Sequence, residues 1–568
     1  MEAETVSNTQ TAEDSRTAKA LGAYYTENRV ASFLVEWAIR SSTDRVLDPG
    51  FGQGVFLRAA WSKIKDMGGR AGAQVYGVEV DSRTYDAVVA TLPQDLRDAV
   101  PNLILCDFFE LTPAALPPIS AVVGNPPFIR YQRFNGDART RALDRARSNG
   151  VPLNRLSSSW APFVAHSTAF LEKGGRLAMV VPLEIAHAGY ARPVLDHLLD
   201  QFSHVELVTF RQKLFPTLGE NTALLLADGK EGRCSHLVLK DLEGAASLPE
   251  SLSGDGPRHS QSDTSPVITR LGRGGRLPEQ LLPPRARAHY DSLRASSQTR
   301  RMGDIADVGI GYVTGHNKFF HLSPSEAALW GIPSEYLRPA VRRGRALRGL
   351  RFTHEDWSEL SHEGMVGFLL HIGAADANLP APVLRYLESG EAMQVPSAYK
   401  CRTRTPWYAV PHVHMSDALL TYMSNASPRL AANLAGVVAT NTLHLVRLKD
   451  EARISGEGLA ALSRTSLVRL SAEIEGHALG GGLLKLEPSE ADALLLPWPD
   501  GAVSSDLSAL SIELDDLVRS GKDELARQVA DREILIRGLG WSQSECALLN
   551  DACVHLQERR RPRRRVAA

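Results

Sequence analysis

Residues 45–60 read RVLDPGFGQGVFLRAA, a stretch that joins two apolar segments through a turn containing Asp48 and three glycines. The first segment predicts a short buried strand and the second predicts a helix. Gly50 and Gly52 let the backbone pass close to a ligand, and the start of the helix offers unpaired N–H groups to a carboxylate or phosphate. Many glycine-rich turns are only tight turns, so the neighbouring strands decide what this one does.

Seven short apolar segments alternate with helical windows between residue 21 and about residue 230. They read RVLDPG, QVYGVEV, LILCDF, ISAVVGN, GRLAMVVP, HVELVTF and TALLLAD. This alternation predicts an α/β domain with a largely parallel sheet. Ligands of such sheets bind at the carboxyl ends of the strands, so the residues at those ends are the candidates for chemistry.

Acidic residues stand at the ends of the first three strands. Glu79 ends the second strand, where a carboxylate can accept both hydroxyl hydrogens of a ribose. Asp107 and Phe108 follow the third, where an acceptor beside an aromatic ring can hold and cover an adenine. A dinucleotide is compatible with the glycines, but an acidic pocket favours a cationic ligand without phosphates. S-adenosylmethionine, with its sulfonium and ammonium charges, fits better than NAD.

The fourth strand runs into AVVGNPPFIRYQRF at residues 121–134. The side-chain oxygen of Asn125 and the carbonyl of Pro126 can accept from the two N–H bonds of an adenine amino group, which localises its nitrogen lone pair. Pro127 restricts the turn, and Phe128 is expected to be an exposed ring on which a base stacks. The alternative is a proline turn whose phenylalanine packs in a core.

The rest of the chain divides by composition. Residues 1–20 are expected to be disordered, 21–245 to form the first domain and the Ser/Pro-rich residues 246–270 a linker or loop. Further predictions are a mixed α+β domain over 271–500, a helical segment over 501–557 with leucines at three- and four-residue spacing, and a basic tail over 558–568.

Bulk properties exclude some classes of protein. The 568 residues are 43% hydrophobic with a net charge of −1. No stretch approaches the roughly 20 apolar residues of a membrane span, and the N-terminus lacks the apolar core of a signal peptide. A cytoplasmic protein without membrane attachment is expected. The five cysteines are scattered without metal-ligand spacing, so no disulfide framework or metal site is predicted.

These motifs resemble the gamma-class N6-adenine DNA methyltransferases of restriction–modification systems. The resemblance runs from LGAYYTENRVASFLVEWA through DPGFGQGVFL, GVEVD, DFF and NPPF, and includes TNTLHLV and GGGLLKLEPSE in the second half. It implies a Rossmann-like class I S-adenosylmethionine-dependent methyltransferase domain, followed by an α+β target-recognition domain and a helical end. By position, it implies cofactor contacts from Tyr25, Thr26, Asp48, Gly50, Gly52, Glu79, Asp107 and Phe108, and base contacts from Asn125, Pro126 and Phe128 in a motif that Pro127 completes.

An adenine inside duplex DNA must be flipped out to reach such a pocket, so a second surface has to grip the duplex. Two arginine-rich segments are candidates for that surface, with Arg342, Arg343 and Arg345 in the first and Arg402, Arg404 and Trp407 in the second. The alternatives are a solvated arginine face and a tryptophan buried in a core. The tail RRRPRRR is either a solubilising end or a nonspecific DNA contact.

Three functions therefore stand beside one another. The first is a site-specific adenine-N6 methyltransferase acting on duplex DNA within a restriction–modification or phage-defence system. The second is a methyltransferase for RNA or a protein glutamine, disfavoured by the long region after the catalytic motifs. The third is a component that binds DNA without methylating it. No nuclease-type carboxylate cluster is evident, so a restriction endonuclease or other defence subunit would be a separate chain.

Overall fold

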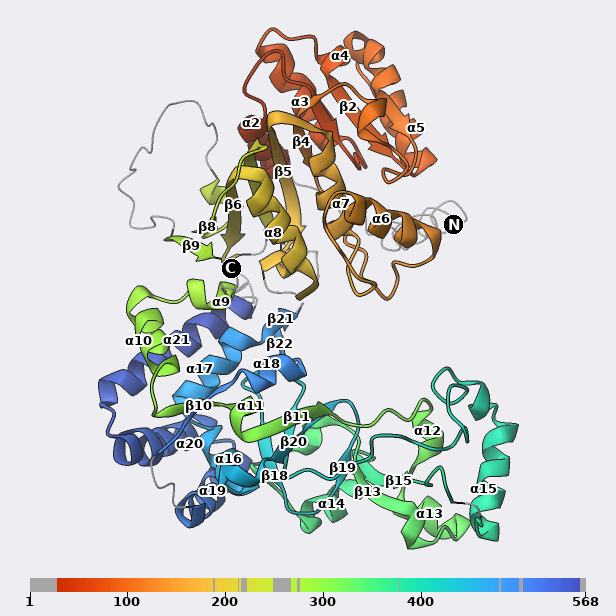
Figure 1. Cartoon of the computed structure of the whole chain (residues 1–568), viewed down its shortest axis with the longest axis vertical. Helices are drawn as coiled ribbons and strands as arrows, with labels where there is room; N and C mark the ends of the chain where they lie inside the picture. Colours follow the sequence, from red (N-terminus) through yellow and green to blue (C-terminus); the bar gives the residue numbers. More distant parts are fainter. Residues whose placement is uncertain are drawn as a thin grey trace, which may run out of the picture. The chain divides into compact units, whose positions relative to one another are not determined.

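The computed structural model describes residues 28–186, 189–212, 214–215, 222–248, 267–272, 276–376, 378–479, 482–499 and 504–561. They form two compact units, an N-terminal unit that ends at Leu281 and a C-terminal unit from Leu282 to Arg561 (Figure 1).

The N-terminal unit is built on a sheet whose described strands run in the order β3-β2-β1-β4-β5-β7-β6-β8-β9. Strands β1 to β5 pair in parallel, and β7 runs antiparallel between β5 and β6. The bounds are β1 (Val46–Asp48), β2 (Val75–Glu79), β3 (Leu103–Leu105), β4 (Ile119–Gly124), β5 (Leu171–Pro182), β6 (Phe202–Phe210), β7 (Thr222–Lys230), β8 (His236–Leu242) and β9 (Val267–Gly272).

The first seven strands lie where the sequence predicts them, and they form the predicted largely parallel sheet. Strand β4 is buried along its whole length, as expected for a central strand covered on both faces. Strand β8 was not predicted because its residues alternate between buried and half-buried, which weakens its apolar signal.

Helices accompany the sheet of the N-terminal unit (Figure 1). Helix α2 buries Val30, Leu34 and Val35 on one side, because these residues recur at helical spacing. The α-helices are α2 (Asn28–Ala38), α3 (Val55–Asp66), α4 (Ala71–Gln74), α5 (Ser82–Ala90), α6 (Gly136–Ser148), α7 (Trp160–Ser167), α8 (Arg192–Gln201) and α9 (Leu277–Gln280). The short 3-10 segments are Gln94–Asn102, Pro113–Ala115, Thr168–Phe170, Leu183–Ala186, Gly189–Ala191 and Ala245–Ser247.

The chain leaves the N-terminal unit later than the sequence indicates. Most of the predicted linker, residues 249–266, lies outside the described residues. After it, β9 pairs with β8 in antiparallel register, from Asp241↔Val267 to His236↔Gly272. Because these backbone hydrogen bonds return the chain to the sheet, the boundary between the two units falls after Leu281 rather than within 246–270.

The C-terminal unit combines small sheets with helices, in agreement with the predicted α+β class. Among its described residues the strand orders are β11-β20-β16-β18-β14, β12-β15-β13-β19, β17-β22-β21 and β10-β23. The strands are β10 (Thr299–Arg301), β11 (Ala306–Ile310), β12 (His321–Leu322), β13 (Leu337–Val341), β14 (Arg351–Phe352), β15 (Val366–Leu370), β16 (Ala418–Thr421), β17 (Met423–Ser424), β18 (Leu430–Asn433), β19 (Val438–Ala439), β20 (Leu443–Leu448), β21 (His477–Leu479), β22 (Leu483–Lys485) and β23 (Leu495–Pro497).

The helices of the C-terminal unit include those predicted near the end of the chain. They are α10 (Pro284–Arg294), α11 (Met302–Ile305), α12 (Asn317–Phe320), α13 (Pro324–Trp330), α14 (His354–Ser361), α15 (Ala381–Ala392), α16 (Gly456–Leu462), α17 (Ser466–Glu475), α18 (Pro488–Asp492), α19 (Ser504–Arg519), α20 (Asp523–Ala530) and α21 (Gln543–Arg560), with a π-helical turn at Asp531–Gly538 and 3-10 turns at Ser334–Tyr336, Gly344–Ala346, Val395–Ser397 and Asp450–Ala452. Within the described ranges, none of these helices or those of the N-terminal unit is long and apolar enough to cross a membrane.

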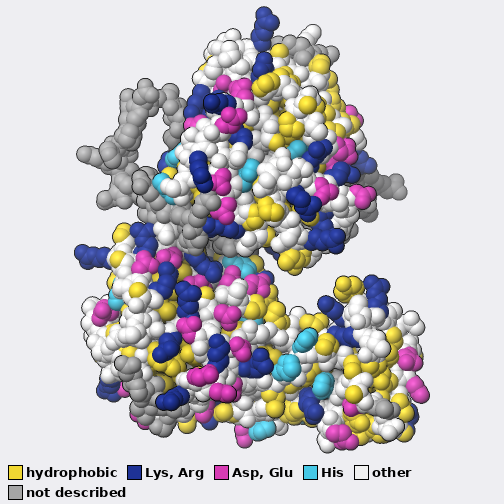
Figure 2. All heavy atoms as spheres, viewed as in Figure 1, with side chains coloured by type: hydrophobic (Ala, Val, Ile, Leu, Met, Phe, Trp, Pro, Cys, Tyr) yellow, Lys and Arg dark blue, Asp and Glu magenta, His cyan; other side chains and the backbone are white. Residues whose placement is uncertain are grey.

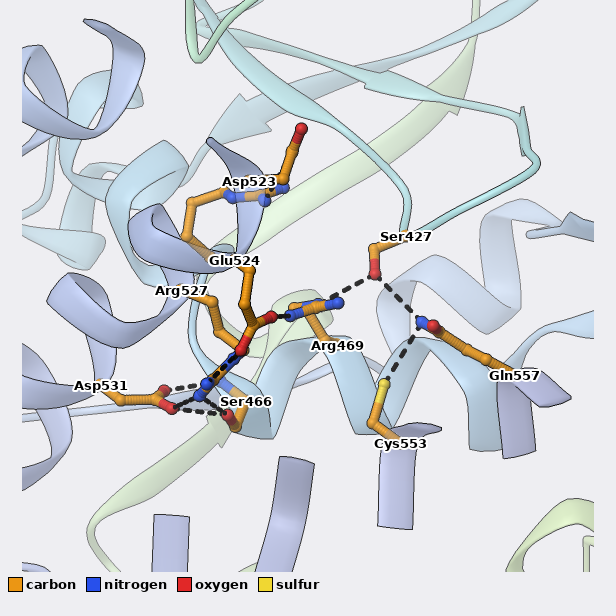
Figure 3. Close-up of polar contacts among 10 residues, drawn as sticks. Ser427, Ser466, Arg469, Asp523, Glu524, Arg527, Asp531, Cys553 and Gln557 are labelled. Carbon is orange, nitrogen blue, oxygen red and sulfur yellow. Dashed lines mark hydrogen bonds and ion pairs between the residues drawn. The ribbon is translucent and has the colours of Figure 1, made fainter. Parts of the chain in front are cut away.

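The last helices belong to the C-terminal unit instead of forming a separate segment. Helix α19 packs on α16, and α21 packs on α17. A buried polar cluster reinforces this packing: the Arg527 guanidinium and both donors of Ser466 bond the carboxylate of Asp531 (Figure 3). Nearby, Arg469 joins Glu524 to Ser427, which in turn accepts a bond from Gln557.

The predicted basic tail also contributes to the fold. Helix α21 extends to Arg560, whose buried guanidinium forms two hydrogen bonds with the carboxylate of Glu473 at 2.9 and 2.7 Å. This arginine is therefore a structural residue of the C-terminal unit and not a solubilising one. Residues 562–568 lie outside the described part of the chain, and the predicted role of the remaining tail stays a prediction.

Removing the carboxylate of Asp531 tests the polar cluster. Asp531→Ala leaves the buried guanidinium of Arg527 without one of its two carboxylates, and we expect the C-terminal unit to lose about 3–5 kcal/mol of unfolding free energy. Denaturant unfolding followed by circular dichroism measures this loss. Glu533→Gln removes a more exposed carboxylate of the same region and should cost about 0–1 kcal/mol. Equal effects of the two variants would contradict the structural role of the cluster.

Candidate active site

The ends of β1 and β4 meet where the strand order of the sheet reverses. These strands pair in parallel, with Val46 opposite Ala121 and Leu47 opposite Val122. At the ends of these two strands, Asp48 and Gly124 lie close together: a Cβ at Gly124 would lie 3.1 Å from Oδ1 of Asp48. The acidic residue of the glycine loop and the NPPF motif are therefore neighbours, at the place where open α/β sheets bind ligands.

Asp48 is a buried carboxyl group at this junction. It is 1% exposed, and its Oδ1 accepts a hydrogen bond from the N–H of Gly50 at 3.3 Å. Its Oδ2 is buried without a hydrogen-bond partner among the described residues. Burial raises the pKa of Asp48 to about 8, the Gly50 bond opposes this shift, and the negative charge of Glu79 adds to it. A cationic ligand beside Oδ2 would satisfy this oxygen and restore its charge.

The glycine loop is held open by its neighbours. Gly52 has a φ of 50° and no atom within 4 Å of the position that a Cβ would take, so only glycine fits it without strain. Phe51, by contrast, points into the core and is 4% exposed. Its ring uses the space left by Gly77, where a Cβ would lie 2.7 Å from Phe51 Cδ1. Phe51 therefore anchors the loop while Gly52 leaves room for a ligand.

Glu79 braces the same loop from the end of β2. Its Oε2 accepts from the N–H of Gly52 at 2.9 Å, and its Oε1 accepts from Val80 at 2.8 Å and Asp81 at 2.9 Å. A carboxylate has about four lone-pair sites, so these three bonds leave capacity for a further donor. The predicted contact with a ribose stays a prediction.

Asp107 and Phe108 lie beside the end of β3. Asp107 Oδ1 accepts from the N–H of Phe109 at 3.0 Å, and its Oδ2 forms an ion pair with Arg141 at 2.9 Å. Phe108 is 2% exposed and lies in a ring cluster, 5.3 Å from Phe163 and 4.7 Å from His166 between centroids. In this structure Phe108 is thus a core residue, and its contact with a cofactor adenine stays a prediction.

The NPPF motif follows β4 directly. Asn125 and Pro127 are half-buried, and Pro126 is buried. Phe128 is 4% exposed and belongs to the hydrophobic core of the N-terminal unit, so the expectation of an exposed ring was wrong. Burial of an aromatic side chain against apolar neighbours is favourable in free energy compared with leaving it exposed to water. Stacking on a flipped base would therefore require Phe128 to become accessible.

Ser159 holds the motif in place, although no motif in the sequence points to it. Its hydroxyl donates to the carbonyl of Pro127 and accepts from the N–H of Ile129 at 2.8 Å. Its own N–H donates to the carbonyl of Ile129 at 3.0 Å. Ser159 is 1% exposed and precedes α7, so a buried helix start fixes Pro127 and Ile129. It is a positioning residue for the loop.

Tyr25 and Thr26, predicted near the cofactor, lie outside the described residues.

The first group of predicted DNA contacts lies around the turn between β13 and β14. Arg343 and Arg345 are exposed and form no ion pair within the described part of the chain. Arg342 is half-buried and its positive charge adds to the effect of burial, which lowers the pKa of His321 to about 4. Arg343 and Arg345 are thus available to a phosphate backbone, while Arg342 lies against a buried histidine.

The second group of predicted DNA contacts, Arg402, Arg404 and Trp407, also contains both an exposed residue and residues that the fold holds in place. Arg402 is exposed and lies over the ring of Tyr399, whose side chain is 66% exposed. Arg404 instead donates to the backbone carbonyls of Thr314 and Val313 at 2.8 and 2.6 Å. Trp407 packs 5.5 Å from Phe319 in a core of the C-terminal unit, which is the alternative weighed for it. Tyr399 was missed, although the sequence YKCR places an aromatic ring among cations.

This arrangement, a buried acidic residue and a glycine loop at the switch point of a mixed sheet, is that of a methyltransferase-type α/β domain. The N-6 DNA Methylase family matches residues 11–246, and the C-terminal domain of the type II methyltransferase M.Eco57I matches residues 276–535. The chain therefore belongs to the N6-adenine DNA methyltransferases of restriction–modification systems. Methylation of DNA is its activity.

Relatives span nearly the whole chain. The type II methyltransferase M.AccI of Acinetobacter calcoaceticus is 20% identical over 526 residues, covering 90% of this chain and 92% of the relative. The type II methyltransferase M.XamI of Xanthomonas campestris pv. amaranthicola is 23% identical over 487 residues, covering 84% of this chain and 85% of the relative. Both units are therefore represented in methyltransferases of similar length.

Solved structures share the fold. The type IIL restriction–modification enzyme MmeI in complex with DNA has a TM-score of 0.56 and 12% identity, covering 91% of this chain and 73% of the MmeI chain. The DrdV–DNA complex has a TM-score of 0.51 and 11% identity, covering 90% of this chain and 59% of the DrdV chain. At this level of identity the comparison concerns the fold alone.

Ser159→Ala tests the positioning of the catalytic loop. Without the hydroxyl, the Pro127 carbonyl and the Ile129 N–H lose their shared partner, and we expect kcat for DNA methylation to fall about 100-fold while KM for DNA changes little. Steady-state transfer of a labelled methyl group measures both constants. Ser159→Thr keeps the hydroxyl and should recover most of kcat. Ser157→Ala is the matched control, because the buried Ser157 hydroxyl has no partner within the described residues.

Proposed function

We propose that the chain transfers the methyl group of S-adenosylmethionine to the amino nitrogen of an adenine flipped out of a specific duplex DNA site. The observation that carries this proposal is the close approach of Asp48 to Gly124. It brings the buried carboxyl group of the glycine loop beside the strand end that carries Asn125 and Pro126. A cofactor held by the first and a base held by the second would meet at one place.

The residues fit this cofactor in charge and in space. The Oδ2 atom of Asp48, which has no partner among the described residues, suits the ammonium group of the methionine part. The open position above Gly52 leaves room for the ligand, and the remaining capacity of the Glu79 carboxylate suits a ribose hydroxyl. When bound, S-adenosylmethionine supplies an electrophilic methyl group.

The chain itself activates the adenine by hydrogen bonding. The amino nitrogen is a poor nucleophile because its lone pair is delocalised into the ring. Acceptance of its two N–H bonds by the Asn125 side-chain oxygen and the Pro126 carbonyl would localise the lone pair on nitrogen. Pro127 and Ser159 hold these acceptors at fixed positions, so little reorganisation is needed during transfer. Phe128 would supply a stacking face once the base enters.

The C-terminal unit would grip the duplex. Arg343, Arg345 and Arg402 are exposed cations that suit phosphate contacts, and Tyr399 adds an exposed ring. Flipping costs a few kcal/mol, which the duplex contacts must offset. Cleavage of unmodified DNA would be carried out by a separate restriction endonuclease or another defence subunit of the host cell, in which the protein is cytoplasmic.

Asn125→Ala tests the proposed chemistry. Loss of one of the two acceptors should lower the rate of labelled methyl transfer to adenine about 100- to 1000-fold, the range for removing one preorganised polar group. Cofactor binding measured by calorimetry should be retained. Asn135→Ala is a matched control, because this exposed amide makes no hydrogen bond that caps α6. Full activity of the Asn125 variant would refute the assigned role.

Protonation of Asp48 provides an independent test of the cofactor site. Since the pKa of Asp48 is raised to about 8, its carboxyl group is mostly protonated at pH 7. A bound ammonium would lower that pKa, so binding of S-adenosylmethionine at pH 7 should release close to one proton, and at pH 9 much less. Calorimetry in buffers of different ionisation enthalpy measures this number. Asp48→Asn should abolish the release, and an unchanged release in that variant would exclude Asp48 as its source.

A further inference from the structure

A hollow of about 720 Å³ lies on the N-terminal unit between α6 and the turn that contains Leu153, Asn154 and Arg155. Figure 2 shows Lys and Arg side chains gathered over this part of the unit, with acidic side chains between them. The charged residues that line the hollow are Arg139, Arg147, Arg155, Asp137 and Asp144.

Both walls of the hollow lead directly to the catalytic loop. On one side, α6 begins at Gly136, a short way along the chain from Phe128. On the other side, the turn at Leu153–Arg155 runs to Ser159, which bonds Pro127 and Ile129. Ser159 therefore connects one wall of the hollow to the loop that carries the NPPF motif.

The arginines of this region divide into structural and available ones. Arg141 pairs with Asp107 at 2.9 Å, and Arg145 Nε donates to the carbonyl of Phe109 at 2.9 Å. These two contacts fix α6 against the loop after β3. Arg139 and Arg155, in contrast, form no ion pair with any residue that the structure describes. They are cations that the fold does not use.

We propose that this hollow binds backbone phosphates of the DNA strand that carries the target adenine, next to the flipped nucleotide. The inference rests on the proposed function, because a flipped base stays bonded to its own backbone and brings the adjoining phosphates to the catalytic loop. Guanidinium groups match phosphate oxygens in a bidentate geometry. The uncapped start of α6 adds backbone N–H donors.

The hollow also contains an opposing charge that makes the proposal testable in both directions. Asp144 is already paired with Arg147 at 2.9 Å, but Asp137 forms no ion pair with a described residue. It lies in the first turn of α6, where a phosphate would approach the N–H groups. Removing its charge should therefore strengthen DNA binding, whereas removing Arg139 or Arg155 should weaken it.

The experiment measures the salt dependence of binding to a short fluorescein-labelled duplex by anisotropy. Arg139→Gln and Arg155→Gln should each lower the slope of log affinity against log salt by about 1, as expected for one lost phosphate contact. Arg139→Lys keeps the charge and should recover most of the slope. Asp137→Asn should increase affinity at low salt. A lysine variant no better than the glutamine variant, or unchanged slopes in both glutamine variants, would overturn the proposal.

Arg233→Gln is the matched control. Arg233 is exposed and follows the end of β7. Because β7 runs antiparallel to β5, with Thr222 opposite Pro182, Arg233 lies at the end of the sheet where β5 begins, opposite to the strand ends that carry the candidate site. The Arg233→Gln variant should have the same slope of log affinity against log salt as the unaltered protein. A failure of the proposed function would be seen separately. In that case Asn125→Ala would still methylate DNA, while the arginine variants would change the slope of log affinity against log salt. If RNA or an acidic peptide bound to the hollow in place of duplex DNA, only those probes would respond to Arg139→Gln, and the proposal would fall.

Discussion

The parallel pairing of β1 with β4 is the constraint on which the site depends. It places Asp48 so close to Gly124 that a Cβ at position 124 would lie 3.1 Å from a carboxyl oxygen of Asp48. The carboxyl group is thereby removed from water and held mostly neutral at pH 7. Burial of an acid without a partner is costly, and proteins tolerate it where a ligand completes the site. A side chain at position 124 would therefore crowd this carboxyl group and the ring of Pro49.

The strands, and the residues at their carboxyl ends, were predictable because both signals are local. An apolar run followed by an acidic or amide residue needs only a few neighbours in sequence to be recognised. The direction of an aromatic side chain is not encoded in this way: Phe108 and Phe128 look alike whether they cover a ligand or fill a core, and both prove to be buried. Ser159 escaped notice because its partners, Pro127 and Ile129, are distant in the chain.

The arginines show the same limit in electrostatic terms. Within one run of sequence, Arg348 pairs with Glu363 and Arg351 pairs with Glu457, while Arg343 and Arg345 pair with no described residue. Whether a carboxylate distant in the sequence lies beside an arginine determines whether that arginine forms an ion pair within the fold or stays available to a polyanion. The role of this basic segment in DNA binding stays a prediction, and only the folded chain separates its paired arginines from the others.

Arg560 also sets a practical boundary for work with this protein. The string ERRRPRRR looks like a dispensable tail, yet its third residue is enclosed with Glu473 inside the C-terminal unit. Trimming the chain before this position would leave a carboxylate sealed in a nonpolar environment, and the affected helices include α17, which carries Ser466. A shortened version designed for crystallisation should therefore retain α21 through Arg561, with any purification tag attached beyond it.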